Sequence, residues 1–227
     1  MSHSGDPVAR VVAIDGPSGS GKSTIARGVA CALGLPVLDT GAMYRAVAVA
    51  ALESGTPLDD EDACARLARE HEIAVDGGVT TIDGRDISAE IRAPEATAAV
   101  SAVAAHPGVR TVLVARQRAW VQRHGGGVVE GRDIGTVVFP AAPLKVYLTA
   151  SDDERARRRQ RDETASARAV DVDEVRRAIA RRDALDRGRV VSPLRVADDA
   201  ITIDTTTRAV DDIVADLVDR ARAAGIA

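Results

Sequence analysis

The sequence predicts an α/β protein with a five-stranded parallel sheet and helices on both of its faces. Apolar runs of strand length recur along the chain without polar alternation, which is typical of strands buried on both faces. Helix-length segments separate these runs, as the connections between parallel strands require. A glycine-rich stretch, GPSGSGKS, follows the first run. The 227 residues suffice for a single domain of this class.

The first part of the chain alternates between strand and helix. The run RVVAIDG ends in glycine, as a buried strand does before a turn. Gly34 and Pro36 stop the helix that follows the glycine-rich stretch. The elements predicted here are a strand at 10–16, a helix at 22–33, a strand at 36–40 and a helix at 42–53.

The region 71–92 departs from this alternation. Its short segments are separated by Asp-Gly pairs, which indicate antiparallel hairpins. Helices are predicted after it at 94–105 and 109–124. We therefore expect an insert between the second and third strands of the sheet.

The alternation resumes with GGVVEGRD at 126–133, whose adjacent valines predict a third buried strand. The remaining predicted elements are strands at 144–150 and 200–206, and helices at 151–163, 172–188 and 208–223. Five strands with helical crossovers complete the predicted doubly wound sheet.

Composition argues against several classes of protein. Hydrophobic residues make up 45% of the chain but aromatic residues only 2%, so the core must consist of Ala, Val, Leu and Ile. A net charge of -4 gives no reason to expect nucleic-acid binding. Cys31 and Cys64 lie in helical stretches without metal or redox spacing, and we expect buried, reduced thiols. The N-terminal residues contain no apolar signal segment and no run approaches ~18 apolar residues, so we expect a cytoplasmic protein without a membrane span.

The stretch GPSGSGKS at 16–23 fits the pattern G-x-x-x-x-G-K-[ST]. A buried strand precedes it and a helix follows it, which favours a phosphate-binding loop over a glycine-rich turn with an incidental lysine. Lys22 would reach the β- and γ-phosphates of ATP, and the Ser23 hydroxyl would bind Mg²⁺. The predicted ATP-binding residues are Gly16, Pro17, Ser18, Gly19, Ser20, Gly21, Lys22, Ser23 and Thr24. The fold class thereby becomes the three-layer P-loop NTPase fold.

The rest of the sequence narrows the class of P-loop protein. A GTPase switch needs an N/T-K-x-D motif, which the chain lacks. A motor or transport ATPase carries adjacent acidic residues at the end of an apolar strand, whereas Glu130 is isolated before Gly131. A kinase of a small molecule remains, and its second substrate must be bound by residues outside the loop.

Four polar clusters lie near the predicted ends of strands, where ligands bind in open α/β sheets. They are DTGAMYR (39–45), EGRDIG (130–135), RARRRQR (155–161) and RRDALDRGR (181–189). We expect them to surround the second substrate.

These clusters resemble the bacterial cytidylate kinases of the P-loop nucleoside monophosphate (NMP) kinase family. The matching pieces are IDGPSGSGKST, LDTGAMYR, GRDIGTVVFP, RRDALDRGR and SPL, which at similar spacing cover nearly the whole chain. The resemblance implies transfer of the ATP γ-phosphate to CMP or dCMP with Mg²⁺, and we expect a monomer because the fold needs no partner to complete its site. It divides the single domain, 1–227, into a core (8–38 and 108–227), an enlarged NMP-binding insert (39–107) and an arginine-rich lid (152–168).

The resemblance implies that arginines bind the phosphate of the acceptor. Arg45, Arg132 and Arg189 would do so through charge-assisted hydrogen bonds. Arg182 and Asp186 would hold the ribose hydroxyl groups. The spacing of Arg182, Asp186 and Arg189 puts them on one helical face, which by itself would predict surface ion pairs.

The resemblance also implies how the base is read. Ser101 and Arg110 would donate to the O2/N3 edge of cytosine, and Asp133 would accept from its N4 amino group. Uracil carries an oxygen at that position, which the carboxylate would repel. Thr40 and Tyr44 would position the base and the phosphate.

The arginine-rich segment 155–161 resembles the lid of the same family. Such a lid places arginines over the transferring phosphoryl group and excludes water. The predicted catalytic residues are Lys22, Arg132, Arg158 and Arg161. The alternative is a solvated helix face, because acidic residues lie nearby in the sequence.

Two other functions stay open at this point. One is a kinase with a non-nucleotide acceptor. The other is a nucleotide-gated binding protein, against which the missing N/T-K-x-D motif argues.

The tetrapeptide GRDI occurs at 84–87 and again at 131–134. The first copy lies on an Asp-Gly turn of the insert, so Arg85 and Asp86 are predicted to be structural. The second copy follows a buried strand, so Arg132 and Asp133 are predicted to bind substrate.

Overall fold

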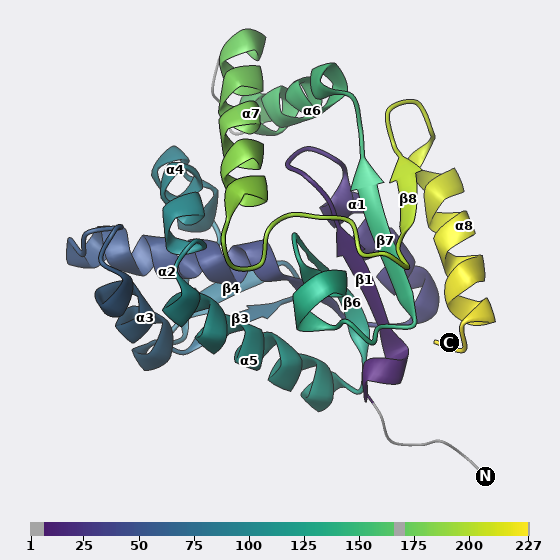
Figure 1. The fold of residues 1–227 in the computed structure, drawn as a ribbon, viewed down its shortest axis with the longest axis horizontal. Coiled ribbons are helices and arrows are strands. Elements are labelled where there is room, and N and C mark those ends of the chain that lie inside the picture. The colour runs from purple at the N-terminus through teal and green to yellow at the C-terminus, as the bar shows by residue number, and fades with distance from the viewer. Residues whose placement is uncertain (1–6, 166–170, 227) are drawn as a thin grey trace.

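The computed structural model describes residues 7–165 and 171–226, and it has the predicted α/β architecture (Figure 1). The main sheet is parallel, with strand order β2-β6-β1-β7-β8. Its strands are β1 (Val11–Asp15), β2 (Val37–Asp39), β6 (Gly127–Gly131), β7 (Leu144–Thr149) and β8 (Ile201–Asp204). Each lies within its predicted segment. In the centre, β1 pairs with β6 so that Asp15 is the partner of Gly131.

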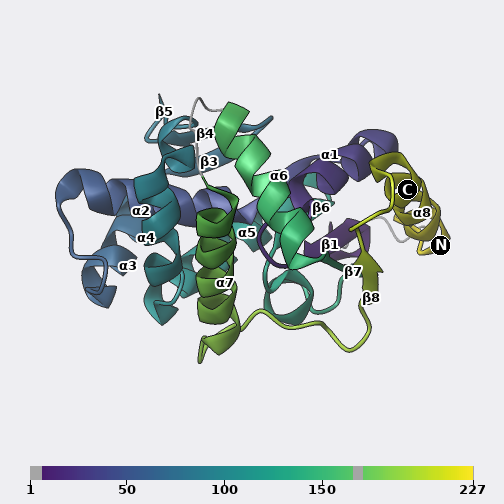
Figure 2. The same ribbon diagram turned by 90° about the horizontal axis from the view of Figure 1, so that it is seen from above.

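Helices cover both faces of this sheet (Figure 2). Side chains of β1 alternate between two clusters, with Val11 and Ala13 in one and Val12 and Ile14 in the other. The second cluster includes residues of α1 (Lys22–Leu33) and α8 (Val210–Ala223), and the first includes residues of α2 (Thr40–Ser54) and α5 (Pro107–His124). Both faces are therefore buried, which explains the unbroken apolar runs in the sequence.

The insert between β2 and β6 contains the predicted hairpins. They form a separate antiparallel sheet of β3 (Ile73–Asp76), β4 (Val79–Ile82) and β5 (Arg85–Asp86). Helix α3 (Glu61–Glu70), the short 3₁₀ helix η2 (Glu90–Arg92) and α4 (Pro94–Val103) complete the insert. A helical stretch around Cys64 was predicted without bounds. It is α3, and the Asp60 side chain caps it by accepting from the Ala63 N–H at 2.9 Å.

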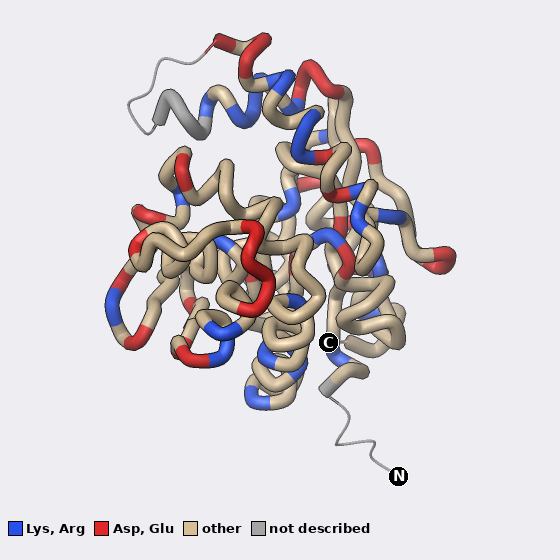
Figure 3. Tube along the Cα trace, turned by 60° about the vertical axis from the view of Figure 1, so that its left-hand side comes forward, with Lys and Arg blue, Asp and Glu red and all other residues tan. Residues whose placement is uncertain are grey.

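Helices α6 (Asp152–Ala165) and α7 (Val172–Gly188) stand above the carboxyl ends of the strands (Figure 1). They share a small hydrophobic cluster of Ala156, Val175 and Ile179. Figure 3 shows basic residues along α6 on this side of the molecule. Of the predicted lid, residues 166–168 lie outside the described part of the chain.

The predictions for the two cysteines and for a membrane span can be compared with the fold. Cys64 is buried as predicted, but the prediction for Cys31 is wrong, because this residue lies on the exposed side of α1. Within the described residues, no single helix is long and apolar enough to cross a membrane. The pair α4 and α5 meets that length and composition test only when joined, and it is bent by 101° at the break.

Candidate active site

The glycine-rich loop connects β1 to α1, as predicted. Gly19 and Gly21 have φ angles of 76° and 88°, which L side chains rarely adopt. A Cβ atom at Gly19 would also lie 2.8 Å from the backbone oxygen of Arg155. The loop therefore curls tightly beneath α6, with α1 beginning at Lys22, and its N–H groups can surround an anion.

Lys22 lies inside this curl and is 8% exposed. Its Nζ donates to the Pro17 carbonyl oxygen at 2.7 Å and to Ser20 Oγ at 3.4 Å. Burial, followed by the positive charge of Arg132, lowers the pKa of Lys22 below its ordinary value. An arriving polyphosphate would reverse this effect, because its negative charge favours the ammonium form.

Two carboxylates that the sequence analysis did not assign lie beside the loop. Glu130 is 4% exposed and lines the same cavity as Ser23, whose side chain acts to lower the pKa of Glu130. Burial, and after it the charge of Asp39, raises the pKa of Glu130. Asp39 also caps α2 by accepting from Ala42 N–H at 3.0 Å.

These oxygen atoms satisfy the requirements of a magnesium ion bound with a nucleotide. Within the described residues, no group of three or more His, Cys, Asp or Glu side chains forms a metal site. Mg²⁺ seldom needs such a cage, because it takes one or two carboxylates together with substrate phosphates and water. The Ser23 hydroxyl and the nearby carboxylates of Glu130 and Asp39 have the chemistry of that donor set.

A cavity of about 670 Å³ joins the loop to the polar clusters. Its lining includes residues from all four clusters: Asp39, Arg45, Glu130, Arg132, Arg158, Arg159, Arg161 and Arg182. The predicted convergence of these sequence segments is therefore correct. So many guanidinium groups in one cavity indicate a polyanionic ligand.

A second, smaller cavity is lined by every predicted acceptor residue except Arg45. The predicted residues in its lining are Thr40, Tyr44, Ser101, Arg110, Arg132, Asp133, Arg182, Asp186 and Arg189. Arg45 lines the larger cavity and pairs with Asp39 at 3.1 Å. Arg132 and Arg182 line both cavities, so the two are neighbours.

The deep end of the smaller cavity is built around a buried ion pair. Arg110 Nη2 donates to Asp133 Oδ2, and these two side chains are 3% and 7% exposed. The Arg110 guanidinium also lies over the Tyr44 ring, 5.3 Å from its centroid. Burial raises the pKa of Tyr44 to about 12, so its hydroxyl stays protonated. The Thr40 hydroxyl donates to the Glu130 carbonyl oxygen at 2.7 Å.

The other end is a network of arginines around Asp186, which is 2% exposed. Asp186 accepts from Arg132 Nε at 2.9 Å and from Arg189 Nη2. Burial acts to raise the pKa of Asp186, but Arg132 and Arg189 overcome it and hold that pKa below its ordinary value. This burial rules out surface ion pairs as the explanation of the spacing in RRDALDRGR.

Several guanidinium N–H groups here have no partner. The Nε atoms of Arg45, Arg182 and Arg189 are buried and make no hydrogen bond to any part of the chain that the structure describes. Burial, together with the charge of Arg132, lowers the pKa of Arg182 to about 9. Unpaired buried donors are costly, so these groups point to an anion that would satisfy them.

Comparison with known proteins decides the family. The family model described as cytidylate kinase matches residues 12–223. The chain belongs to the cytidylate kinase family. It is 49% identical to a cytidylate kinase of Mycobacterium leprae, over 92% of this chain and 94% of that protein. It is 50% identical to one of Mycobacterium avium, over 86% and 88%.

A longer relative is also similar. The chain is 51% identical to a bifunctional pantoate ligase/cytidylate kinase of a Synechococcus strain, over 88% of this chain. It spans 38% of the length of that protein. The resemblance to cytidylate kinases noted in the sequence is thereby confirmed at the level of the family.

In this member of the cytidylate kinase family, the arginines of α6 have different surroundings. Arg158 lines the larger cavity and donates to the Thr205 side-chain and carbonyl oxygens at 2.8 and 2.6 Å. Arg161 is 70% exposed and pairs with Glu154 at 3.3 Å. Arg155 faces inward, between α6 and α7. The helix is therefore neither a uniform catalytic face nor a uniformly solvated one.

Sequence analysis missed one further residue that shapes this candidate site. Asp15 ends β1, is 5% exposed, and accepts from the Ile134 and Gly135 N–H groups, each at 2.8 Å. It thereby holds a single π-helical turn, Ile134–Val138, directly after Asp133. The sequence shows Asp15 between an apolar run and the glycine-rich loop. It does not show that Asp15 binds backbone N–H groups more than a hundred residues away.

Proposed function

We propose that this chain transfers the γ-phosphate of ATP to CMP or dCMP, giving ADP and the diphosphate. The observation that carries the proposal is the placement of Asp133 and Arg110 at the deep end of a cavity whose other end is rich in arginine. A carboxylate there suits the N4 amino group of cytosine, and the unpaired arginine N–H groups suit a monophosphate.

The reaction needs positioning more than a proton acceptor. An oxygen of the CMP phosphate attacks the γ-phosphorus atom, and the bond from that atom to the bridging oxygen of ADP breaks, with the electron pair leaving on ADP. Lys22 and the loop N–H groups would hold the donor phosphates, and Arg132 would neutralise charge between donor and acceptor.

The donor set around Ser23 supports binding of Mg²⁺ together with the ATP phosphates. When bound, this ion neutralises phosphate charge and orients the donor. Ser23, Glu130 and Asp39 are the residues that would hold it, directly or through water. The same proposal assigns 39–107 to NMP binding and α6 to the lid, and it keeps the predictions of a monomer and of a cytoplasmic location.

A coupled assay of ADP release tests the proposal across CMP, dCMP, UMP, AMP and GMP. Turnover should be fastest with CMP and dCMP. A preference for a purine monophosphate would overturn the assigned base reading. Tight ATP binding without turnover of any monophosphate would instead favour a non-nucleotide acceptor or a nucleotide-gated binding protein.

A further inference from the structure

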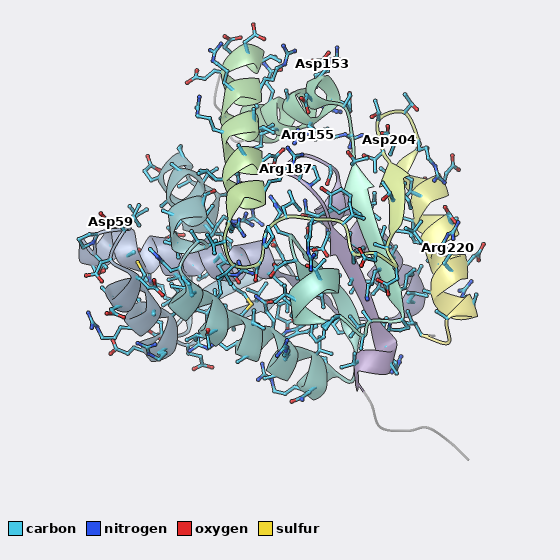
Figure 4. All side chains as sticks on the ribbon, viewed as in Figure 1. Asp59, Asp153, Arg155, Arg187, Asp204 and Arg220 are labelled. Atoms are coloured by element: carbon cyan, nitrogen blue, oxygen red, sulfur yellow. The ribbon has the colours of Figure 1, made fainter. Side chains whose placement is uncertain are left out.

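A buried ion pair lies outside both cavities, between the two helices above the sheet. Arg155 of α6 is 5% exposed and Asp183 of α7 is 1% exposed. Arg155 Nη1 donates to Asp183 Oδ2. Figure 4 labels Arg155 between α6 and α7, above the sheet. Neither Arg155 nor Asp183 is among the described residues that line the large cavity. The pair therefore does not face the reacting groups.

Both members of the pair bind the backbone of the phosphate loop. The Ser18 N–H donates to Asp183 Oδ1 at 3.2 Å, and the Ser18 carbonyl oxygen accepts from Arg155 Nη1 at 3.0 Å. The next residue is Gly19, where a Cβ atom would meet the Arg155 backbone. The outer turn of the loop is therefore held by side chains from two helices that are remote in sequence.

The same helix also reaches the acceptor end of the site. Asp183 lies three residues before Asp186, which binds Arg132 and Arg189. Helix α7 thus places one buried carboxylate on the donor loop and the next on the acceptor arginines. Figure 2 shows α7 between the insert and the helices of the core, as such a connection requires.

A buried ion pair is a poor source of stability, because the cost of removing two charges from water offsets their attraction. Apolar residues of similar volume would fill the same space between α6 and α7, where Ala156, Val175 and Ile179 already pack. The pair differs from an apolar contact in one respect: it supplies a hydrogen-bond acceptor and a donor to Ser18.

We propose that Arg155 and Asp183 are positioning residues for ATP: they hold the phosphate loop in its nucleotide-binding shape and tie that shape to the docking of α6 on α7. The inference deepens the proposed function and rests on it. Loss of the pair weakens ATP binding, whereas CMP binding depends on Asp186 and its arginines and changes less.

Isothermal titration calorimetry with ATP, in the absence of CMP, tests the proposal in the full chain. Asp183→Asn should bind ATP about tenfold more weakly, the effect of losing one or two hydrogen bonds to charged groups. The KM for CMP should change by less than about threefold. ATP binding at wild-type strength would overturn the proposal.

A double variant covers the case in which Asp183→Asn fails to fold because Arg155 loses its buried acidic partner and keeps the exposed Asp152. Arg155→Met with Asp183→Leu removes both charges and should restore thermal stability. ATP affinity should stay about tenfold below wild type, since neither new side chain can bind Ser18. Recovery of ATP affinity together with stability would show a structural role only, and would overturn the proposal.

Asp152→Ala is the matched control. Asp152 accepts from the other terminal nitrogen of Arg155, Nη2, at 2.6 Å, but its side chain is 75% exposed. The Asp152→Ala variant should bind ATP like wild type. A loss of ATP affinity equal to that of Asp183→Asn would contradict the inference that the pair acts through its hydrogen bonds to Ser18. Because the readout is ATP binding, these outcomes stand apart from the proposed function, which fails only if the wild-type chain does not phosphorylate CMP.

Discussion

The two copies of GRDI place the same four residues in opposite environments. In the first copy, the Arg85 side chain is 50% exposed and pairs with Glu53 at 2.6 Å. In the second copy, the Arg132 side chain is 17% exposed and binds Asp186, which is almost fully buried. The Asp86 side chain accepts from the Ser88 N–H at 2.8 Å, two residues along the chain, whereas the Asp133 side chain pairs with Arg110 in the interior.

The flanking segments account for the difference. The first copy follows Asp83, a non-glycine residue with a φ angle of 49°, and forms a short edge strand of the hairpin sheet. The second copy ends a central strand, and Asp15 fixes the turn that follows it. A short motif therefore has the role that its neighbours in space impose, and corresponding variants in the two copies measure this contrast.

The largest expected difference is in catalysis. Arg132→Ala should lower kcat for CMP about a thousandfold, the lower end of the effect of an arginine acting on phosphoryl-transfer charge. Arg85→Ala should leave kcat unchanged. Steady-state assays at saturating ATP and CMP make the comparison, and equal losses in the two variants would contradict it.

Stability and specificity come next. Asp133→Ala leaves Arg110 as an unpaired buried charge and should lower the free energy of unfolding by about 3–5 kcal/mol. It should also reduce the preference for CMP over UMP by about 10- to 100-fold. Urea unfolding and kcat/KM ratios measure the two effects. Asp86→Ala is the control, and a preference for CMP that survived in Asp133→Ala would refute the assigned reading of the base.

A smaller difference depends on pH. Burial raises the pKa of Asp15, which supports the second copy, to about 6. A carboxyl group whose pKa is raised in the folded state stabilises the fold at low pH, where it is protonated. This stabilisation is lost as the pH rises from the unfolded-state pKa through the folded-state pKa. The stability of Asp15→Asn relative to wild type should therefore increase by about 3 kcal/mol between about pH 3 and pH 7. A pH-independent difference between their unfolding free energies would exclude this titration.

The smallest effect belongs to the first copy itself. Arg85→Ala removes a solvent-exposed ion pair with Glu53 and should change the free energy of unfolding by less than about 0.5 kcal/mol. Thermal and urea unfolding would check it. A loss comparable to that of Asp133→Ala would mean that the hairpin turn is as critical as the buried strand end.

The fold was predictable to the extent that its signals are local. Apolar runs located every strand of the main sheet, and Asp-Gly pairs located the hairpins. The bounds of helix α3 were not predicted, because its buried positions are small residues, Ala63, Cys64, Ala65 and Ala68, rather than a stripe of large apolar ones. The π-helical turn was not predicted because the hydrogen bonds that hold it are accepted by Asp15, which is distant in the sequence.

The site divides in the same way. Motifs located the phosphate loop and the residues proposed to bind the acceptor, and the structure places them around two neighbouring cavities. Motifs did not reveal which arginines already have protein partners: Arg110 with Asp133, Arg155 with Asp183 and Arg158 with Thr205. Those pairings depend on how α5, α6 and α7 pack around the ends of the sheet strands, and a single sequence contains no direct signal of that packing.

Asp15 and Gly131 are partners across β1 and β6. The phosphate loop starts at the residue after Asp15, and Arg132 is the residue after Gly131. Neighbouring strands lie about 4.8 Å apart. The first residue of the phosphate loop and Arg132 therefore follow paired positions on adjacent strands, and the backbone hydrogen bonds between β1 and β6 fix how far apart those two positions lie.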